Sequence, residues 1–361
     1  MSDYSTSALE IVRARPSFLA TMRSAGPDFW TLTKPEVNFL IVIATFAGFY
    51  LGSSSDVHGF SFVQLLNTLL GALLVASGAG ALNQCMEHRF DARMRRTSGR
   101  PVPAGRVRLA TACWFGVALA IIGAVDLLVN VNAVASALAV FTLASYLFLY
   151  TPLKRKTPLC TLVGSIPGAM PPLIGWAAAT GSIADSGAWL LYALLLLWQL
   201  PHVMAIAWMY REDYARAGYL MFPAKNQANF MGWQTLGPSL VLFFLTLAAV
   251  AADGGGILRY SATAILGSAL LYYATRQVFL PSRLAARELL KATIFYLPLE
   301  LLILVLCANR FDRSHSRGDR NGKRTCRPGT SRTESTQKGQ LRQGKLRGDS
   351  RQPSRERAFR P

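Results

Sequence analysis

Residues 60–91 read FSFVQLLNTLLGALLVASGAGALNQCMEHRFD, and this stretch decides the fold. Its first part, 60–82, is an apolar run that is long enough, as a helix, to cross a hydrocarbon layer of about 30 Å. Helix is the expected form, because every backbone donor in lipid must be satisfied within its own segment. The run continues directly into a polar array that contains two carboxylates. Polar groups at the end of a membrane span are expensive, so we expect this array to be functional.

The pattern of residues 60–82 recurs along the chain. Hydrophobic residues make up 52% of the 361 residues and charged residues only 16%, which is too little charge to cover a soluble domain of this size. A membrane β-barrel would show short segments of alternating hydrophobicity instead. We therefore expect an all-α, polytopic membrane bundle of nine transmembrane helices. The apolar runs are 36–52, 60–82, 109–128, 133–150, 159–179, 187–208, 233–252, 257–279 and 290–308.

The formal net charge of +19 is divided unevenly. Residues 313–361 hold 15 Lys and Arg against 4 Asp and Glu, so they supply +11 and the rest of the chain +8. No aromatic or groove-reading element accompanies this charge, so no nucleic-acid partner is expected. The five cysteines form no C-x-x-C pair and are odd in number, which argues against a disulfide framework or a zinc site.

The distribution of Lys and Arg predicts the orientation. With a cytoplasmic N-terminus, 21 of the 23 Lys and Arg in the first 312 residues fall in inside segments, and only Arg259 and Arg310 fall outside. The long polar loops 83–108 and 209–232 then share the cytoplasmic face. Two four-helix halves plus a ninth helix would bring these loops together, so the substrate site is expected at their junction.

The chain is expected to have three parts. Residues 1–35 form a cytoplasmic N-terminal segment and residues 36–308 the membrane domain. Residues 309–361 form a basic tail that lacks apolar periodicity and cannot bury a core, so we expect it to be disordered. Nine spans would place this tail on the outer side. Long polar segments can cross the membrane whatever their charge.

The polar array has the spacing of a ligand set. Asn83, Glu87 and Asp91 recur at i, i+4 and i+8, so on a continuing helix they share one face. Mg²⁺ suits such carboxylates, because it binds a few of them together with substrate phosphate oxygens. Arginines, which bind phosphate, follow at once; they are Arg93, Arg95, Arg96 and Arg100. The array predicts a magnesium–diphosphate site, and the alternative is a solvated helix with i,i+4 ion pairs and an arginine cluster that anchors the inner end.

The array reads N-x-x-x-E-x-x-x-D and runs on into R-R-T-S-G-R-P-V-P. In this form it resembles the first motif of the UbiA superfamily of membrane prenyltransferases. The fuller pattern N-Q-x-x-E-x-x-x-D-A-x-M-x-R-T is similar to the haem-modifying branch of that superfamily. Three further stretches agree in order and spacing, namely 32–35 (LTKP), 150–155 (YTPLKR) and 198–219, and the resemblance covers roughly residues 28–308.

The resemblance implies a bundle around a central cavity and a Mg²⁺-dependent enzyme. Its substrates would be farnesyl diphosphate and haem B, and its products haem O and diphosphate. Lys154 and Tyr150 match the family's Y-x-x-x-K element, whose lysine would meet the diphosphate. The second family motif maps onto Asp213 with Arg216 beside it, but Ala217 stands where a second aspartate is usual.

The expected site is therefore as follows. The expected metal ligands are Asn83, Glu87, Asp91 and Asp213, and these residues together with Lys154 form the expected catalytic set. The expected substrate-binding residues are Arg95, Arg96, Arg100, Tyr150, Arg216, Trp198 and His202.

His202 lies in the sixth apolar run, near Trp198 and Pro201. As a functional residue it would ligate the haem iron or orient the porphyrin, and a proline kink would open space beside it. The alternative is an ordinary histidine, hydrogen-bonded in the packing of the helix.

Other functions stay open. A UbiA-type transferase with a quinone or chlorin acceptor is the nearest alternative. A multi-span transporter is further away, because it would carry charges in the middle of its spans, whereas this chain gathers them at one face. The expected partners are farnesyl diphosphate, haem B, the lipid bilayer and downstream haem-modifying or oxidase-assembly proteins. The expected location is the cell inner (plasma) membrane, with the active-site face cytoplasmic.

Overall fold

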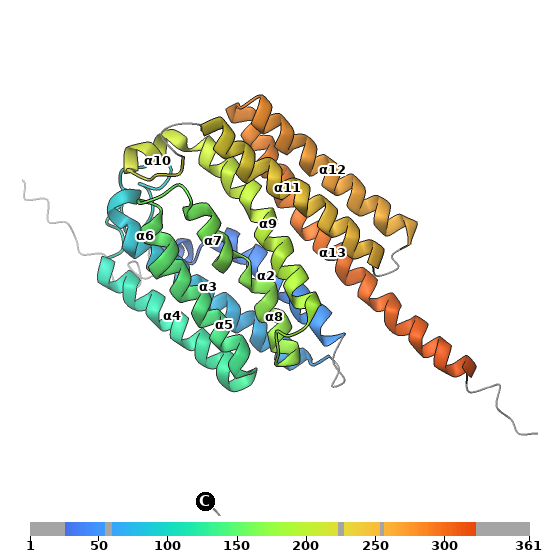
Figure 1. Ribbon diagram of the computed structural model, residues 1–361. Coiled ribbons are helices and arrows are strands. Elements are labelled where there is room, and N and C mark those ends of the chain that lie inside the picture. The colour runs from blue at the N-terminus through green and yellow to red at the C-terminus, as the bar shows by residue number, and fades with distance from the viewer. Residues whose placement is uncertain (1–25, 55–59, 223–226, 253–255, 323–361) are drawn as a thin grey trace, which may run out of the picture. The chain divides into compact units, whose positions relative to one another are not determined.

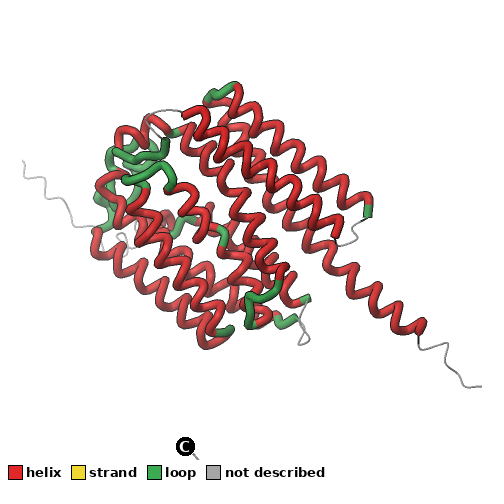
Figure 2. Tube along the Cα trace, viewed as in Figure 1, coloured by secondary structure: helices red, strands yellow, loops and turns green. Residues whose placement is uncertain are grey.

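The computed structural model describes residues 26–54, 60–222, 227–252 and 256–322, with only the backbone for residue 228 and residues 307–322. Every regular element in these ranges is a helix (Figure 2), which confirms the predicted all-α class. The described residues up to residue 315 form one compact unit, and a second unit begins at Ser316. The last helix continues to Gly322. Most of the predicted segments 1–35 and 309–361 lies outside the described residues, so the predicted division into three parts stays a prediction.

The helices follow the predicted apolar runs closely (Figure 1). The first spans are α2 (Pro35–Ser53), α3 (Phe62–Asp91), α4 (Leu109–Asn130) and α5 (Ala133–Ala144). A π-helix, η1 (Ser145–Tyr150), then leads into α6 (Thr151–Leu153), α7 (Cys160–Gly168), α8 (Met170–Thr180) and α9 (Ser186–Met209). The remaining helices are α10 (Arg211–Ala217), α11 (Gln227–Ala252), α12 (Ile257–Phe279) and α13 (Arg283–Gly322).

The predicted number of spans needs a correction. Among the described residues, eight helical segments are long and apolar enough to cross a membrane, with α5 to α6 and α7 to α8 each counting as one. The segment predicted as the eighth span is helical as α12, but it is not among the eight. Arg259, Arg276 and several hydroxyl-bearing residues lower its apolar content. The count of nine apolar spans is therefore one too high, although the class of fold is right.

Local sequence signals explain where the helices begin and break. Pro35 occupies the first turn of α2, where its missing N–H costs nothing. Ser61 and Asn132 cap α3 and α5 by accepting hydrogen bonds from Gln64 N and Ala135 N. The π-helical turn η1 directly precedes the segment that carries Lys154, and such turns often occur at functional sites.

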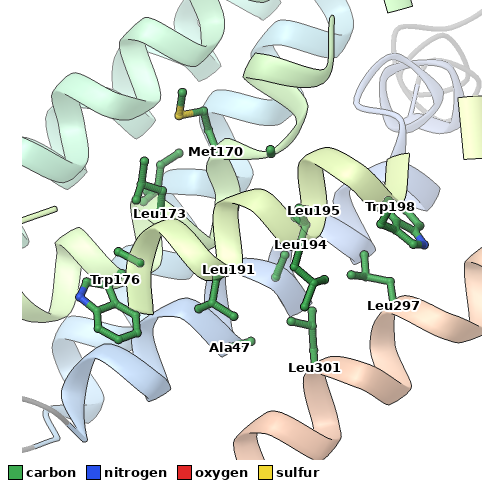
Figure 3. Close-up of a cluster of buried hydrophobic side chains, with 14 of the residues drawn as sticks. Ala47, Met170, Leu173, Trp176, Leu191, Leu194, Leu195, Trp198, Leu297 and Leu301 are labelled. Carbon is green, nitrogen blue, oxygen red and sulfur yellow. The ribbon is translucent and has the colours of Figure 1, made fainter. Parts of the chain in front are cut away.

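The interior of the bundle is a continuous apolar cluster. Figure 3 shows Leu194 and Trp198 of α9 beside Leu301 and Leu297 of α13, and Leu191 of α9 facing Ala47 of α2. Close backbone packing joins α2 to α8, because a Cβ added to Gly175 would lie 2.0 Å from the carbonyl oxygen of Thr45. Packing of this kind stabilises helix pairs in lipid, where burial of apolar surface from water drives little association.

One end of this unit gathers the polar loops. The residues between α3 and α4, the turn after α6 and the short helix α10 lie there together (Figure 1). Two hydrogen bonds connect them, since Arg96 N donates to Asp213 and Leu220 N donates to the carbonyl of Lys154. The prediction that the two long polar loops meet is confirmed.

Candidate active site

Asn83, Glu87 and Asp91 lie on the last turns of one continuous helix, α3, as their spacing predicts. All three side chains are buried, with exposed fractions of 2%, 6% and 1%. Buried carboxylates require partners, because an isolated charge away from water is very costly. The partners come from other segments of the chain.

Glu87 pairs with Lys154, at the turn that follows α6. The Nζ atom of Lys154 lies 3.0 Å from one carboxylate oxygen of Glu87 and 3.1 Å from the other. It also lies 4.6 Å from the centroid of the Tyr150 ring. Burial alone would lower the pKa of Lys154, but the neighbouring Tyr150 and Glu87 outweigh it, and the pKa is well above its usual value. Lys154 is therefore a fixed positive charge beside Tyr150 and Glu87.

Asn83 is held between two further residues. Its carbonyl oxygen accepts a hydrogen bond from Lys34 Nζ at 2.9 Å, and its amide donates to Thr151 Oγ1 at 3.1 Å. Lys34 has a φ of 54°, a left-handed conformation that costs a non-glycine residue about 1–2 kcal/mol. Backbone strain of this kind clusters at functional sites. Sequence analysis missed Lys34 as a site residue, although the LTKP stretch was the available signal.

Asp91 ends α3 and is paired with the loop that follows it. Its Oδ2 accepts a hydrogen bond from Arg100 Nη1 at 2.6 Å. Its backbone carbonyl accepts one from Thr97 Oγ1 at 2.9 Å. The loop between α3 and α4 therefore folds back over the end of the helix, and Arg100 pairs with Asp91 there.

Asp213 links the polar loop 209–232 to the polar loop 83–108. It is buried on α10, where its two oxygens accept hydrogen bonds from the backbone N–H of Arg96, at 3.2 Å, and from the side chain of Arg216. The guanidinium of Arg96 lies over the Tyr210 ring, 4.8 Å from its centroid. Arg95 and Arg96 are both exposed, but none of the contacts found among the described residues joins Arg95 to Asp213. The structure thus brings Arg96 and Arg216 to Asp213, but not Arg95.

The donor set suits a hard cation that also binds a ligand from outside the protein. Among the described residues, no group of three or more His, Cys, Asp or Glu side chains could hold a metal ion. Each candidate carboxylate has a basic partner instead, in the pairs Glu87–Lys154, Asp91–Arg100 and Asp213–Arg216. Mg²⁺ often takes only one or two carboxylates and completes its shell with phosphate oxygens and water. The chemistry of these oxygens fits such a shared site.

Trp198 and His202 form a separate group on α9. Their rings are stacked, with centroids 4.9 Å apart, and both contact Thr293 of α13. Trp198 Nε1 donates to the Thr293 carbonyl at 2.7 Å, and His202 Nδ1 lies 2.9 Å from Thr293 Oγ1. No contact found among the described residues joins Trp198 or His202 to Asn83, Glu87, Asp91 or Asp213, so their predicted roles stay predictions.

A groove of about 400 Å³ lies on the surface of α11 and α12. Its lining residues are Asn229, Gly232, Trp233, Leu236, Gly237, Leu240 and Val278. None of the predicted site residues lines it. The predicted central cavity therefore stays a prediction.

Comparison with known proteins shows which family the chain resembles. Residues 41–297 match the UbiA prenyltransferase family. The protoheme IX farnesyltransferase of Solibacter usitatus (strain Ellin6076) is 41% identical over 286 residues, which cover 77% of this chain and 98% of that protein. The protein of the same name from Salinibacter ruber (strain DSM 13855 / M31) is 39% identical over 282 residues, again 77% and 98%.

Solved structures share the fold. A structure of digeranylgeranylglyceryl phosphate synthase has a TM-score of 0.64 at 17% identity, covering 78% of this chain and 98% of that chain. A UbiA homolog from Archaeoglobus fulgidus bound to GPP and Mg²⁺ has a TM-score of 0.53 at 13% identity, covering 76% and 99%. The resemblance seen in the sequence is confirmed at the level of the whole membrane unit. The chain belongs to the UbiA prenyltransferase family.

Proposed function

We propose that this protein transfers a farnesyl group from farnesyl diphosphate to a vinyl group of haem B, giving haem O and diphosphate, with Mg²⁺ as cofactor. One observation carries the proposal: three buried carboxylates, each held by a basic side chain, meet at one end of a multi-span helical unit. Relatives named protoheme IX farnesyltransferase support the choice of substrates. The Archaeoglobus fulgidus homolog bound to GPP and Mg²⁺ supports a shared metal–diphosphate site.

The paired charges suit the binding of a diphosphate. When bound, Mg²⁺ would neutralise the leaving diphosphate, with Asn83, Glu87, Asp91 and Asp213 as its candidate ligands. Lys154, Lys34 and Arg100 hold these residues now and would share the charge of the diphosphate oxygens. Because each carboxylate already has a cationic partner, none of them is an uncovered charge before substrate arrives. Substrate binding would exchange these partners rather than leave a charge uncovered.

The group on α9 suits the haem. Thr293 Oγ1 donates its single hydrogen to the carbonyl of Leu290, at 2.7 Å, so toward His202 it can only accept. With this placement of the hydroxyl hydrogen, His202 Nδ1 carries the proton and the lone pair is on Nε2. Histidines that bind metal usually donate their other N–H in this way. The hydrogen bond to Thr293 supports His202 as a ligand of the haem iron through Nε2.

The reaction then needs no nucleophilic residue. The C1–O bond of farnesyl diphosphate breaks, and the electron pair leaves with the diphosphate. The vinyl carbon of haem attacks C1, and water captures the resulting cation beside the ring and loses a proton, which gives a hydroxyethylfarnesyl group. Tyr150, beside Lys154, offers an aromatic face to the allylic cation.

We also propose an inner-membrane location with the site on the cytoplasmic face. The eight apolar helical segments support a multi-pass protein. Of the 23 Lys and Arg in the first 312 residues, 21 fall in the predicted inside segments and two outside, which supports the orientation. Binding to downstream haem-modifying or oxidase-assembly proteins stays a prediction.

The direct test uses the purified protein in lipid nanodiscs. The protein is incubated with haem B, farnesyl diphosphate and Mg²⁺, and haem O is sought by mass spectrometry. We expect haem O to form and its formation to stop with excess EDTA. Formation of a prenylated quinone or chlorin, with no haem O when each acceptor is offered alone, would overturn the assignment of the acceptor.

A further inference from the structure

The chain that leaves α10 runs beside the turn that carries Lys154, the partner of Glu87. Gly218, with a φ of 78°, ends α10 and turns the chain. The N–H of Leu220 then donates to the carbonyl of Lys154 at 2.9 Å. Burial alternates along this segment, because Tyr219 and Met221 are buried while Gly218 and Leu220 are exposed. The backbone thereby directs the Tyr219 side chain into the site.

Tyr219 is surrounded by residues of the proposed diphosphate site. Its ring centroid lies 6.0 Å from Lys154 Nζ and 5.7 Å from the centroid of Phe90, one turn after Glu87 on α3. Only 6% of Tyr219 is exposed. The first polar array, the Y-x-x-x-K element and the segment after α10 therefore meet at this one side chain.

The hydroxyl of Tyr219 has one candidate acceptor among the described residues, the carboxylate of Glu87. It is buried and makes no close hydrogen bond to that carboxylate or to any other described atom. A phenol is neutral near pH 7 and keeps its proton to donate. Glu87 already accepts from Lys154 and is a candidate Mg²⁺ ligand, so the phenol is a buried donor that an oxygen of a bound ligand can satisfy.

We infer that Tyr219 is a substrate-binding residue that donates a hydrogen bond from its phenol to an oxygen of the prenyl diphosphate, an inference that rests on the proposed function for the place of the diphosphate. Lys154 is the link, since the same ammonium that would meet the diphosphate lies beside the Tyr219 ring. The phenol adds a neutral donor to a set of cations, so it can bind the diphosphate without drawing Glu87 or Asp91 out of position. Tyr219 is neither one of the candidate metal ligands nor one of the basic residues of the site, so this role is additional to theirs.

Tyr219→Phe tests the inference, because it removes the hydroxyl and keeps the ring. The full-length protein in nanodiscs is titrated with inorganic diphosphate and Mg²⁺ by calorimetry, and the KM values for farnesyl diphosphate and haem B are measured separately. We expect the diphosphate to bind about tenfold more weakly or worse, as for the loss of a hydrogen bond to a charged group. The KM for haem B should not change. The melting temperature should change little, since Glu87, the one described acceptor near the hydroxyl, keeps its ion pair with Lys154.

Tyr296→Phe is the matched control. Tyr296 is also buried, at 2% exposure, and its hydroxyl likewise makes no close hydrogen bond among the described residues, its one polar neighbour being Thr246, but it lies on α13. We expect its diphosphate affinity to equal that of the wild type. Wild-type affinity in Tyr219→Phe, or an equal loss in both variants, would overturn the inference. If the wild type binds diphosphate but makes no haem O, the proposed function fails, while the binding comparison still decides the role of Tyr219.

Discussion

The Nζ atom of Lys154 contacts both carboxylate oxygens of Glu87, at 3.0 and 3.1 Å, although the two residues are 67 positions apart in the chain. Both side chains are largely buried, with exposed fractions of 13% and 8%. A buried ion pair rarely adds net stability, because the loss of hydration offsets much of the attraction. Its presence at the end of α3 is better explained by the proposed function, in which it would keep a cation and a candidate pair of Mg²⁺-binding oxygens ready at one point.

Removing a carboxylate from α3 should stop transfer without preventing membrane insertion. We expect Glu87→Ala and Asp91→Ala each to lower kcat/KM for farnesyl diphosphate at least about 100-fold, because a charge-matched oxygen ligand for Mg²⁺ is lost. Glu36→Ala removes an exposed carboxylate on α2 and should keep full activity. Near-wild-type rates in both α3 variants at limiting Mg²⁺ would contradict the assignment of these ligands.

Lys34 should contribute to diphosphate binding through its charge and not through its left-handed backbone. Lys34→Asn accepts the left-handed conformation more readily than most residues, so the protein should fold normally. It lacks the ammonium that holds Asn83, and we expect a loss of about tenfold or more in affinity for diphosphate. Isothermal titration with Mg²⁺ and diphosphate measures this. Restoration of the affinity by Lys34→Arg would support a charge effect, and unaltered affinity in Lys34→Asn would exclude Lys34 from the site.

Asp213 offers a choice between two roles. If it binds Mg²⁺, Asp213→Asn should raise the Mg²⁺ concentration needed for half-maximal activity about tenfold or more, because an amide is a poorer ligand than a carboxylate. If it mainly holds the backbone N–H of Arg96, the asparagine can still accept that bond and the Mg²⁺ requirement should stay the same. We expect the first result. A normal Mg²⁺ curve in Asp213→Asn, with a large loss in Asp213→Ala, would show the second.

His202 and Thr293 should act on the haem and not on the diphosphate. We expect His202→Ala to alter the Soret band of bound haem B and to raise its KM. Thr293→Val, which keeps the shape but removes the acceptor for Nδ1–H, should weaken haem binding less, by about three- to tenfold, since it changes only the tautomer preference. Absorption spectra and both KM values measure this. An unchanged Soret band in His202→Ala together with a higher KM for farnesyl diphosphate would refute the proposal.

The Glu87–Lys154 pair should be insensitive to pH between about pH 6 and 9, because the pKa of Glu87 is lowered and that of Lys154 is raised. The pKa of Lys154 is raised in the folded protein, so its contribution to stability is complete below the ordinary lysine pKa of about 10.4. That contribution is lost only as the pH rises through the still higher folded pKa. The difference in melting temperature between the wild type and Glu87→Leu/Lys154→Met should therefore be constant from about pH 6 to 9. A clear change of this difference within that range would show that Lys154 titrates there.

Much of the architecture followed from local pattern. The width of the hydrocarbon layer sets the length of a spanning helix, so the apolar runs could be recognised one by one. The i, i+4, i+8 spacing placed Asn83, Glu87 and Asp91 on one face of α3, because helical periodicity is a property of the segment alone. The count failed only at α12, where Arg259, Arg276 and hydroxyl-bearing residues make the segment less apolar than the other spans although it forms a helix.

The pairing of charges was decided by the tertiary structure. Asp213 meets the backbone of Arg96 from 117 positions away, and Lys34 reaches Asn83 from 49 positions away. The sequence by itself determined the spans, the face of α3 and, through its motifs, the family. Which cation meets which carboxylate, the strained backbone of Lys34 and the inward direction of Tyr219 depend on how distant segments pack at one end of the unit. No local periodicity specifies that packing, because it results from contacts between helices and not from the pattern within any one of them.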